Sequence, residues 1–415
     1  MDYERVVKGI LDIGESMLQS GAENYRLEDS LYRMCKSYGF LSSDVYVIPS
    51  NLQITVETPD GRFITQIRHI ENMDLNFDRL DYLNNLSRYV CQNTPDAPQL
   101  QDKYNEVLQR PKQHPAAKYF AGIMGGTGFA VFFGCDFMDA VVAIIVSLMI
   151  VICGEWLHKR ENNMIVYNMI LSFLAEFVIL ASFHLGISHH PERIMIGIVM
   201  LLISALGTTN GIRDLMQKDI ISGSVNIIHS MLGAAGIAFG TALALLMFGD
   251  IASAGFVLND NIPIQLISCT IACTGFALWF KIRGRQVLYS SVGAFFTWGI
   301  YLIVYHFNPS NFFATLVASI FVAFYAFIMS RINKAPSTIF LTASVFPLIP
   351  GPNLYYLMYG CVSRNISLAF NEAIVLFATC LAIAFGFIII DVVSRIIMHI
   401  MKRDYHIRKN SSLHE

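Results

Sequence analysis

Charged residues are scarce in this sequence. Only 14% of its 415 residues are Asp, Glu, Lys or Arg, whereas 54% are hydrophobic and the mean hydropathy is +0.50. A typical soluble domain carries about 25% charged residues, so this composition excludes an ordinary soluble globular protein and predicts that most of the chain lies in lipid. The formal net charge of -2 is close to neutral and favours no nucleic-acid partner.

Motifs of common enzymes are also absent. The sequence contains no Gly-x-Ser-x-Gly, no His-Glu-x-x-His and no P-loop, which argues against a hydrolase and against transport driven directly by ATP. Its eight cysteines are scattered. Cys269 and Cys273 would share a helix face, but no His or carboxylate accompanies them. We therefore predict no enzyme activity, no metal site and no cofactor.

Met1 to Gly39 lack the apolar segment of a secretory signal peptide, which predicts an amino terminus in the cytoplasm. Residues 1–115 have the pattern of a soluble α+β domain, in which Glu23 to Asp29 are expected to be a solvated face that caps a helix. A turn is predicted at Pro59-Asp60-Gly61. Helical periodicity and short β-branched runs predict helices at 6–18, 25–38, 77–91 and 98–109 and strands at 44–48, 52–57 and 62–68.

The rest of the chain predicts an α-helical polytopic membrane protein. A bilayer core about 30 Å thick is crossed by roughly 20 apolar residues in a helix. Ten apolar runs of about this length occur, at 118–134, 138–154, 165–184, 193–207, 221–248, 262–280, 286–306, 312–330, 337–361 and 370–398.

Basic residues in the connectors predict the orientation of these spans. Only Arg193 and Arg364 fall on one side of the membrane. Lys and Arg accumulate on the cytoplasmic side of a membrane. The side that carries all the other basic connector residues is therefore expected in the cytoplasm, together with both termini. The location is expected to be a bacterial inner membrane. The connector residues on that side are Lys159, Arg160, Arg213, Lys218, Lys281, Arg283, Arg285, Arg331 and Lys334.

One predicted span is interrupted by prolines. Thr338 to Val362 contain Pro347, Pro350 and Pro352, which remove backbone donors and fix φ, so the run cannot remain α-helical. Lipid offers the freed carbonyl groups no partners, and a helix broken at membrane depth is therefore typical of a span that lines a binding cavity. A proline kink that only shapes helix packing is the alternative.

The ten spans divide into five and five, which predicts two inverted repeats. The expected modules are residues 116–250 and 251–400, followed by a basic cytoplasmic tail at 401–415. In the fourth span of the first module, Gly207 to Gly211 would form a break that corresponds to the one near Pro350.

Four stretches carry a resemblance to a known family. Ile13 to Arg26, Ile48-Pro49, Gly207 to Leu215 with Ser222-Gly223, and Pro347 to Asn353 resemble, in order, the motifs of the threonine/serine exporter family in its fused two-module form. The resemblance implies ten spans, a cytoplasmic N-terminal domain and proton-driven export of small hydroxy amino acids. Related two-protein systems are linked to dicarboxylate export, so a succinate-type substrate is an alternative. Gly207-Thr208 stands where many relatives have Pro-Gly.

Glu176 is the candidate for proton coupling. It lies near the middle of its predicted span, where a charged, unpaired carboxylate costs several kcal/mol and the neutral form is favoured. The alternative is a neutral Glu hydrogen-bonded inside the bundle. Closer to span ends, four charged residues are expected to lie at interfaces, namely Glu155, Glu372, Asp391 and Arg395.

Arg213 and Asp214 suit a zwitterion, because Arg binds a carboxylate and Asp accepts from an ammonium group. A salt bridge at the end of the span is the alternative. Asn226 and His229 are secondary polar candidates, although a lone His in a span is more typical of helix packing. The predicted substrate-binding residues are Gly207, Thr208, Thr209, Asn210, Arg213, Asp214, Pro350, Gly351, Pro352 and Asn353.

Together these features predict a secondary transporter that exports threonine or serine, with protons and membrane lipid as partners and a homo-oligomer left open. A channel would need polar rings that the apolar runs do not show. A membrane-tethered sensor or enzyme would need residues 1–115 to bind a ligand or turn over a substrate on their own.

Overall fold

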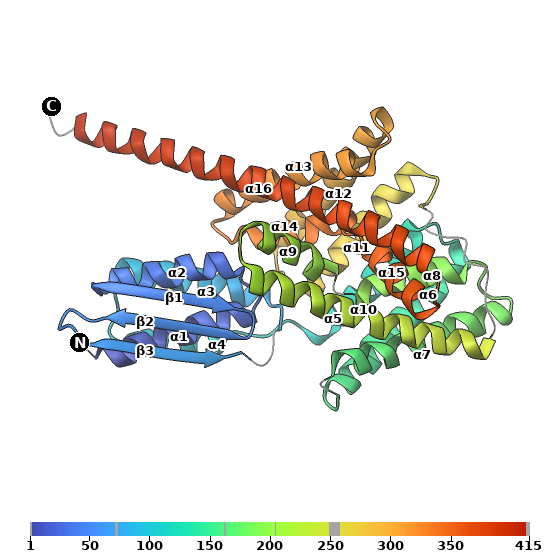
Figure 1. The fold of residues 1–415 in the computed structure, drawn as a ribbon, viewed down its shortest axis with the longest axis horizontal. Helices are drawn as coiled ribbons and strands as arrows, with labels where there is room; N and C mark the ends of the chain where they lie inside the picture. The colour runs from blue at the N-terminus through green and yellow to red at the C-terminus, as the bar shows by residue number, and fades with distance from the viewer. Residues whose placement is uncertain (1, 71–73, 162, 204, 249–257, 412–415) are drawn as a thin grey trace.

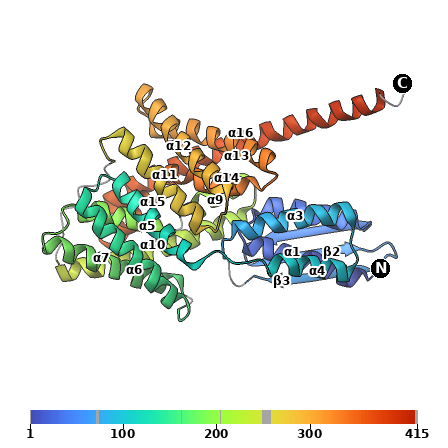
Figure 2. The ribbon, with the colours of Figure 1, turned by 180° about the vertical axis from the view of Figure 1, so that it is seen from behind.

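The computed structural model describes residues 2–70, 74–161, 163–203, 205–248 and 258–411. An α+β unit formed by the first 108 residues lies at one end of the molecule, and a helical bundle that begins at Pro115 makes up the rest (Figure 1). The last helix, α16 (Ile366–Ser411), extends out of the bundle on the side of the α+β unit (Figure 2).

Two helices cover one face of a three-stranded sheet in the α+β unit, and the other two helices of the unit pack on them (Figures 1 and 2). The sheet is antiparallel in the order β1-β2-β3, with Val45 opposite Ile54. Alternate residues of the central strand, Leu52, Ile54 and Val56, are buried against the helices, as the period of two requires. The elements, all predicted, are α1 (Tyr3–Gln19), α2 (Asn24–Ser37), β1 (Ser42–Ile48), β2 (Asn51–Glu57), β3 (Phe63–His69), α3 (Phe77–Asn93) and α4 (Ala97–Leu108).

Every predicted span falls on a helix or a pair of helices. Seven helices are long and apolar enough to cross a membrane, or eight spans if one bent pair is included, within the described residues. This is a multi-pass membrane protein, but the predicted count of ten is not reached by length and composition, because α5 is glycine-rich and the proline-interrupted span is two short helices. The helices are α5 (Pro115–Phe132), α6 (Phe137–His158), α7 (Met164–His184), α8 (Pro191–Leu202), α9 (Ala205–Met216), α10 (Ile220–Phe248), α11 (Ile262–Trp279), α12 (Arg285–Phe307), α13 (Asn311–Asn333), α14 (Ser337–Val345), α15 (Gly351–Val362) and α16.

Glycines allow α5 to pack closely on α11. A Cβ built on Gly128 of α5 would lie 2.8 Å from the backbone nitrogen of Ala272 on α11, and one on Gly275 of α11 would lie 2.5 Å from the backbone nitrogen of Gly125. Small residues at such positions let helix backbones approach, which is how membrane helices gain contact in the absence of a hydrophobic driving force. The α5–α11 pair therefore joins two helices that lie far apart in the sequence.

The first interrupted span differs from the prediction. α8 ends at Leu202, where Ile203 takes an extended conformation, and the axes of 191–202 and 207–216 differ by 55°. Gly207 to Asn210 are helical inside α9, so the break precedes them. The run contains no proline, and Gly211 serves a different purpose, because its Cβ would lie 2.7 Å from the carbonyl oxygen of Gly223 on α10. The glycine permits a close helix crossing and does not end the helix.

The second interruption is as predicted. α14 ends at Val345, a 3-10 turn covers Phe346–Leu348, and α15 begins at Gly351. Ile349 is extended, and Pro350 is the N-cap residue of α15. Pro is tolerated in the first turn of a helix, where backbone N–H groups have no intrahelical partner, so the proline run ends one helix and starts the next.

The α+β unit contacts the bundle at the connectors that carry basic residues. The Lys281 ammonium lies 2.6 Å from the Asp74 carboxylate, and the Arg283 guanidinium lies 3.4 Å from Asp78. The backbone N–H of Phe77 donates to the carbonyl of Phe280, and their rings are in contact. These contacts fix the unit against the ends of α11 and α12.

Candidate functional site

A cavity of about 690 Å³ lies where the α+β unit meets the bundle, and we name it the junction crevice. Its walls come from α2 and α3 of the unit and from α9, α13, α14 and α16 of the bundle. It therefore brings together one part of each interrupted span, α9 and α14. Residues whose polar side chains line it include Glu23, Arg26, Arg213, Gln217, Thr338, Asp391 and Arg395.

Glu23 links these two parts. Its Oε1 accepts from Nη1 of Arg213 on α9, at 3.4 Å, and from the hydroxyl of Thr338 on α14, also at 3.4 Å. Its Oε2 accepts from Nε of Arg26, at 2.9 Å. Glu23 makes no side-chain cap to α2 and is 17% exposed, so the expectation of a solvated capping face is wrong at this residue. Gly21, with φ of 98°, gives the chain the sharp turn that precedes it.

The charge of Glu23 is held by its neighbours. Burial alone raises the pKa of this carboxyl, but the guanidinium groups of Arg213 and Arg26 and their hydrogen bonds outweigh burial and lower the pKa from 4.5 to about 2. Glu23 is therefore ionised at every physiological pH. The ion pair between Glu23 of the α+β unit and Arg213 of α9 therefore does not depend on pH in this range.

Arg213 is almost completely buried, at 6% exposure. Besides Glu23, it interacts electrostatically with Asp214 and with Asp391 of α16, and its guanidinium lies 5.9 Å from the ring centre of Phe387. Its Nε has no hydrogen-bond partner among the described residues. A buried guanidinium with an unsatisfied donor at a cavity wall can bind a further acceptor.

Asp214 and Asn226 do come together. The Asn226 amide donates to Oδ2 of Asp214, at 3.3 Å, so the neighbour of Arg213 binds α10 and does not pair with Arg213. A second contact fixes the same corner, because the Asn24 amide donates to the hydroxyl of Ser222 at 2.9 Å. His229 is exposed on the outer face of α10 and does not join this group.

The threonines of α9 lie inside the bundle. Thr208 and Thr209 are buried, whereas Gly207 and Asn210 are partly buried. The hydroxyl of Thr209 contacts the Cys380 thiol of α16 at 3.7 Å. Thr209 therefore connects α9 to α16.

The proline-bounded residues lie next to the first interruption. A Cβ on Gly351 would lie 2.5 Å from the sulfur of Met200 and 3.4 Å from Ile203, at the end of α8. Pro352 is buried, and the Asn353 amide donates to the Glu372 carboxylate at 2.7 Å. The two interruptions therefore meet inside the bundle, and Glu372 contacts a predicted site residue.

Glu176 is buried on α7 at 5% exposure, and its Oε2 has no hydrogen-bond partner in the described part of the chain. Its electrostatic neighbours are Glu192, near the start of α8, and Tyr355, on α15. No basic residue is among its electrostatic neighbours. Glu176 thus faces the other parts of both interrupted spans, α8 and α15.

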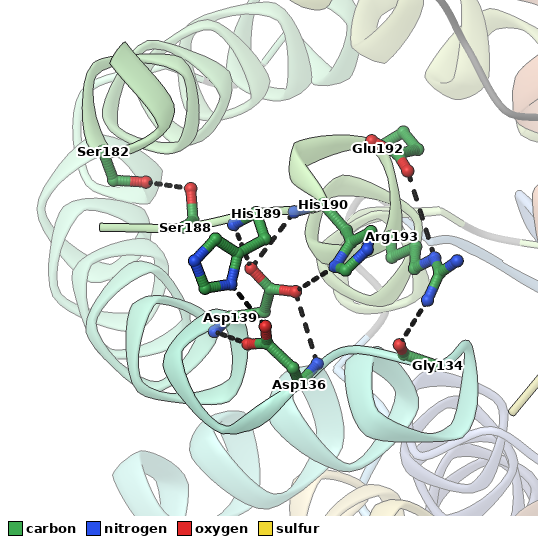
Figure 3. A network of polar contacts seen from close by, with 9 residues as sticks. All are labelled: Gly134, Asp136, Asp139, Ser182, Ser188, His189, His190, Glu192 and Arg193. Atoms are coloured by element: carbon green, nitrogen blue, oxygen red, sulfur yellow. Dashed lines mark hydrogen bonds and ion pairs between the residues drawn. The ribbon is translucent and has the colours of Figure 1, made fainter. Parts of the chain in front are cut away.

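A second polar network joins the α5–α6 and α7–α8 connections (Figure 3). His189 pairs with Asp136, and His190 pairs with the fully buried Asp139 at 2.8 Å. The hydrogen bond and charge of Asp136 raise the pKa of His189. Ligand atoms of Asp136, Asp139 and His189 lie within 4.8 Å of one another, so this group could hold a divalent cation. The carboxylates of this group already accept side-chain or backbone hydrogen bonds. The group can therefore also be a structural link between the two connections.

The arrangement defines a multi-pass helical transporter, in which two interrupted helices meet inside the bundle and opposite charges lie at their ends. Two family models match the chain, one for a threonine/serine exporter over residues 8–248 and one named "Threonine/Serine exporter, ThrE" over residues 265–393. The chain belongs to the threonine/serine exporter family. Members are transporters, so the protein is a membrane transporter of the amino-acid export class and not an enzyme.

Two curated relatives extend over most of the chain. The "Threonine/serine exporter" of Corynebacterium glutamicum is 22% identical over 402 residues, which is 92% of this chain and 81% of the relative. The "Probable threonine/serine exporter" of Mycobacterium tuberculosis is 21% identical over 403 residues, which is 93% of this chain and 75% of the relative. No solved structure matches.

Glu23, Thr338 and Asp391 were not singled out as site residues from the sequence. Glu23 and Arg213 are 190 positions apart, and no local pattern links them. Both residues lie in stretches that resemble family motifs. That resemblance would have indicated a contact between them only if the two motifs were assumed to lie side by side. The His–Asp network had no signal beyond the adjacent histidines.

Proposed function

We propose that the protein exports threonine and serine from the cytoplasm as a secondary transporter driven by the proton motive force. The observation that carries the proposal is the buried Arg213 opposite Glu23 and Asp391, at the point where one part of each interrupted span meets. A guanidinium beside carboxylates complements the carboxylate and ammonium groups of a free amino acid.

The proposed protein has ten spans in a bacterial inner membrane, with both termini cytoplasmic. Residues 1–115 form the cytoplasmic domain, 116–250 and 251–400 the membrane modules, and 401–415 the cytoplasmic tail. The contacts of Lys281 and Arg283 with the α+β unit support this orientation, since the unit and the basic connectors then share the cytoplasmic side. Arg88 supports it further, because it donates to the carbonyl of Lys334.

Helix pairing supports two inverted repeats. Contacts of the first module recur between the equivalent helices of the second. α7 packs on α10 as α13 packs on α16, and α9 packs on α10 as α15 packs on α16. Contacts between modules are also exchanged, because α9 packs on α16 and α10 packs on α15. A pseudo-twofold relation between five-helix modules accounts for all of these pairings at once.

In this arrangement α9 and α14 are the cytoplasmic parts of the interrupted spans, and α8 and α15 are the outer parts. The proposed transport path runs from the junction crevice past the buried threonines of α9 to the meeting point of Gly351 with α8. The substrate-binding residues are those predicted on α9 and at Pro350 to Asn353. Glu176, which faces the outer parts, is the proposed proton carrier, because an unpaired buried carboxyl can exist neutral and charge only when its surroundings change.

Flux measurements test the proposal. Proteoliposomes that contain the purified protein should release or accumulate labelled threonine and serine with saturable kinetics, and an imposed proton gradient should raise the rate. Succinate should not compete. Absence of threonine and serine flux would refute the substrate assignment, saturable succinate flux in its place would favour the dicarboxylate alternative, and unsaturable ion current would favour a channel.

A further inference from the structure

The junction crevice holds a pair of opposite charges whose hydrogen bonds are incomplete. Glu23 lies 3.4 Å from both Arg213 and Thr338, whereas a charge-assisted bond is usually about 2.7–2.9 Å long. Arg213 is 6% exposed, and its Nε lacks a partner among the described residues. Arg26 holds Oε2 of Glu23 at 2.9 Å, so the remaining capacity for a ligand in the crevice lies at Oε1 of Glu23 and at the Arg213 guanidinium.

The size and charge of the crevice restrict that ligand. About 690 Å³ lies within the range of roughly 300–1,000 Å³ that small-molecule sites occupy. The arginines outnumber the acidic residues, which attracts the anionic end of a ligand toward the crevice. The charged lining residues are Arg26, Arg33, Arg88, Arg213, Arg331, Arg395, Glu23, Asp29 and Asp391.

At the buried wall, however, Arg213 has several carboxylates as electrostatic neighbours, Asp214 among them. Glu23 comes from the α+β unit and Asp391 from α16, and both interact electrostatically with Arg213. A ligand carboxylate on Arg213 would place an adjacent ammonium group within reach of these carboxylates. A second carboxylate at the same place would be repelled by them, so a dicarboxylate fits less well.

We infer that the junction crevice is a cytoplasmic binding site for the exported amino acid, in which the α-carboxylate binds Arg213 and the α-ammonium binds Glu23 and Asp391. The inference rests on the proposed function and adds to it that the α+β unit supplies a substrate ligand. The incoming carboxylate competes with Glu23 for Arg213, so binding also loosens the link that Glu23 makes between α9 and α14.

The test compares L-threonine with two single-charge analogues and with succinate on the full-length protein in nanodiscs by calorimetry. L-threonine carries both charges, N-acetylthreonine only the carboxylate, and threonine amide only the ammonium group. Wild-type protein should bind threonine at least about tenfold more tightly than either analogue, because each charged hydrogen bond contributes about that factor. Tighter binding of N-acetylthreonine or succinate than of threonine would overturn the inference.

Glu23→Gln provides the decisive variant. It should weaken threonine about tenfold and leave N-acetylthreonine unchanged or tighter, because the competing carboxylate is removed while Arg213 remains. The dissociation constant of N-acetylthreonine divided by that of threonine should therefore fall at least about tenfold. A structural role for Glu23 alone would weaken both ligands together and leave the ratio unchanged, which would overturn the inference.

Asp78→Asn is the matched control. Asp78 also pairs with a bundle arginine at 3.4 Å, but it lies outside the crevice. It should leave the ratio of the two ligands within about twofold of wild type. If Asp78→Asn reproduces the effect of Glu23→Gln, loosened docking of the unit is the cause and the inference is wrong.

Flux separates this inference from the proposed function. If threonine flux is present but the ligand ratio is unchanged in Glu23→Gln, the proposed binding site is wrong and the proposed export function is retained. A Glu23-dependent ratio without threonine flux would uphold the site and refute export. Absence of both threonine binding and threonine flux would overturn both.

Discussion

The two interrupted spans reach the same outcome through different chemistry. Between α14 and α15 the chain breaks because three prolines fall within six residues, and the break is lined by apolar side chains such as Phe346, Leu348 and Ile349. Between α8 and α9 the chain bends by 55° without a proline. The interruption between α8 and α9, the first in the chain, is followed by Arg213 and Asp214. The span of the second interruption has no charged residue from Ser337 to Val362.

The difference indicates a division of labour. Prolines fix a backbone shape, which makes the second interruption a rigid surface that contacts the end of α8 through Gly351. The first interruption depends on neighbours for its shape, through the close approach of Gly211 to Gly223 and the bond from Asn226 to Asp214. We therefore expect charge recognition in the first span and positional support in the second.

Replacement of Arg213 should have the largest effect. Arg213→Ala removes the charged partner of a substrate carboxylate and leaves Glu23 and Asp391 without it, so kcat/KM for threonine in proteoliposomes should fall about 100-fold, or about 2.7 kcal/mol. Thr338→Val in the second span should cost only about threefold. Similar losses for the two variants would contradict the division, and Arg283→Ala should leave transport within about twofold.

Replacement of Glu176 tests whether α8 and α15 share one proton carrier. Glu176→Gln keeps the size of the side chain but cannot ionise, so accumulation driven by a proton gradient should be lost by at least about tenfold while threonine exchange without a gradient persists. Glu155→Gln is the control, because Glu155 lies near a span end and binds Lys118 and Tyr119. Unchanged coupling in Glu176→Gln would remove it from the proton path.

Two glycine substitutions compare the rigidity of the interruptions. In Gly211→Ala the new Cβ meets the backbone oxygen of Gly223 at 2.7 Å, which cannot move without shifting α10, so the free energy of unfolding should fall by about 1–3 kcal/mol. In Gly351→Ala it meets the Met200 sulfur, which can rotate away, and the loss should stay below about 1 kcal/mol. Denaturant unfolding in micelles measures both losses of unfolding free energy. A larger loss in Gly351→Ala than in Gly211→Ala would contradict this comparison.

The smallest effect concerns the pH dependence of the contacts that Glu23 makes with α9 and α14. Since the pKa of Glu23 is lowered from 4.5 to about 2, its ion pair contributes fully above pH 4.5 and is lost only as pH falls toward 2. The ratio of threonine affinities of wild type and Glu23→Gln should therefore be constant from pH 5 to pH 8. A change in that ratio within this range would show that a carboxyl of this group titrates, either Glu23 itself or Asp214 and Asp391, which interact electrostatically with it.

Sequence patterns predicted what depends on local chemistry. The prolines near Pro350 placed the second interruption correctly because their effect on φ is independent of context. The first was misplaced because Gly207 to Gly211 are compatible with a helix, and only their packing on α10 decides the outcome. Burial of Glu176 was correctly expected from its position in an apolar run. The partners of Arg213 were not predictable, since they come from separate elements that only the fold brings together.

The contact of Glu23 with Thr338 has a consequence for assembly. Glu23 precedes the helical bundle in the chain, yet it binds Thr338 near the start of α14. The α+β unit therefore makes its full set of contacts only when α9 and α14 have packed in the correct relative position. Its docking thus depends on helices that come from distant parts of the chain.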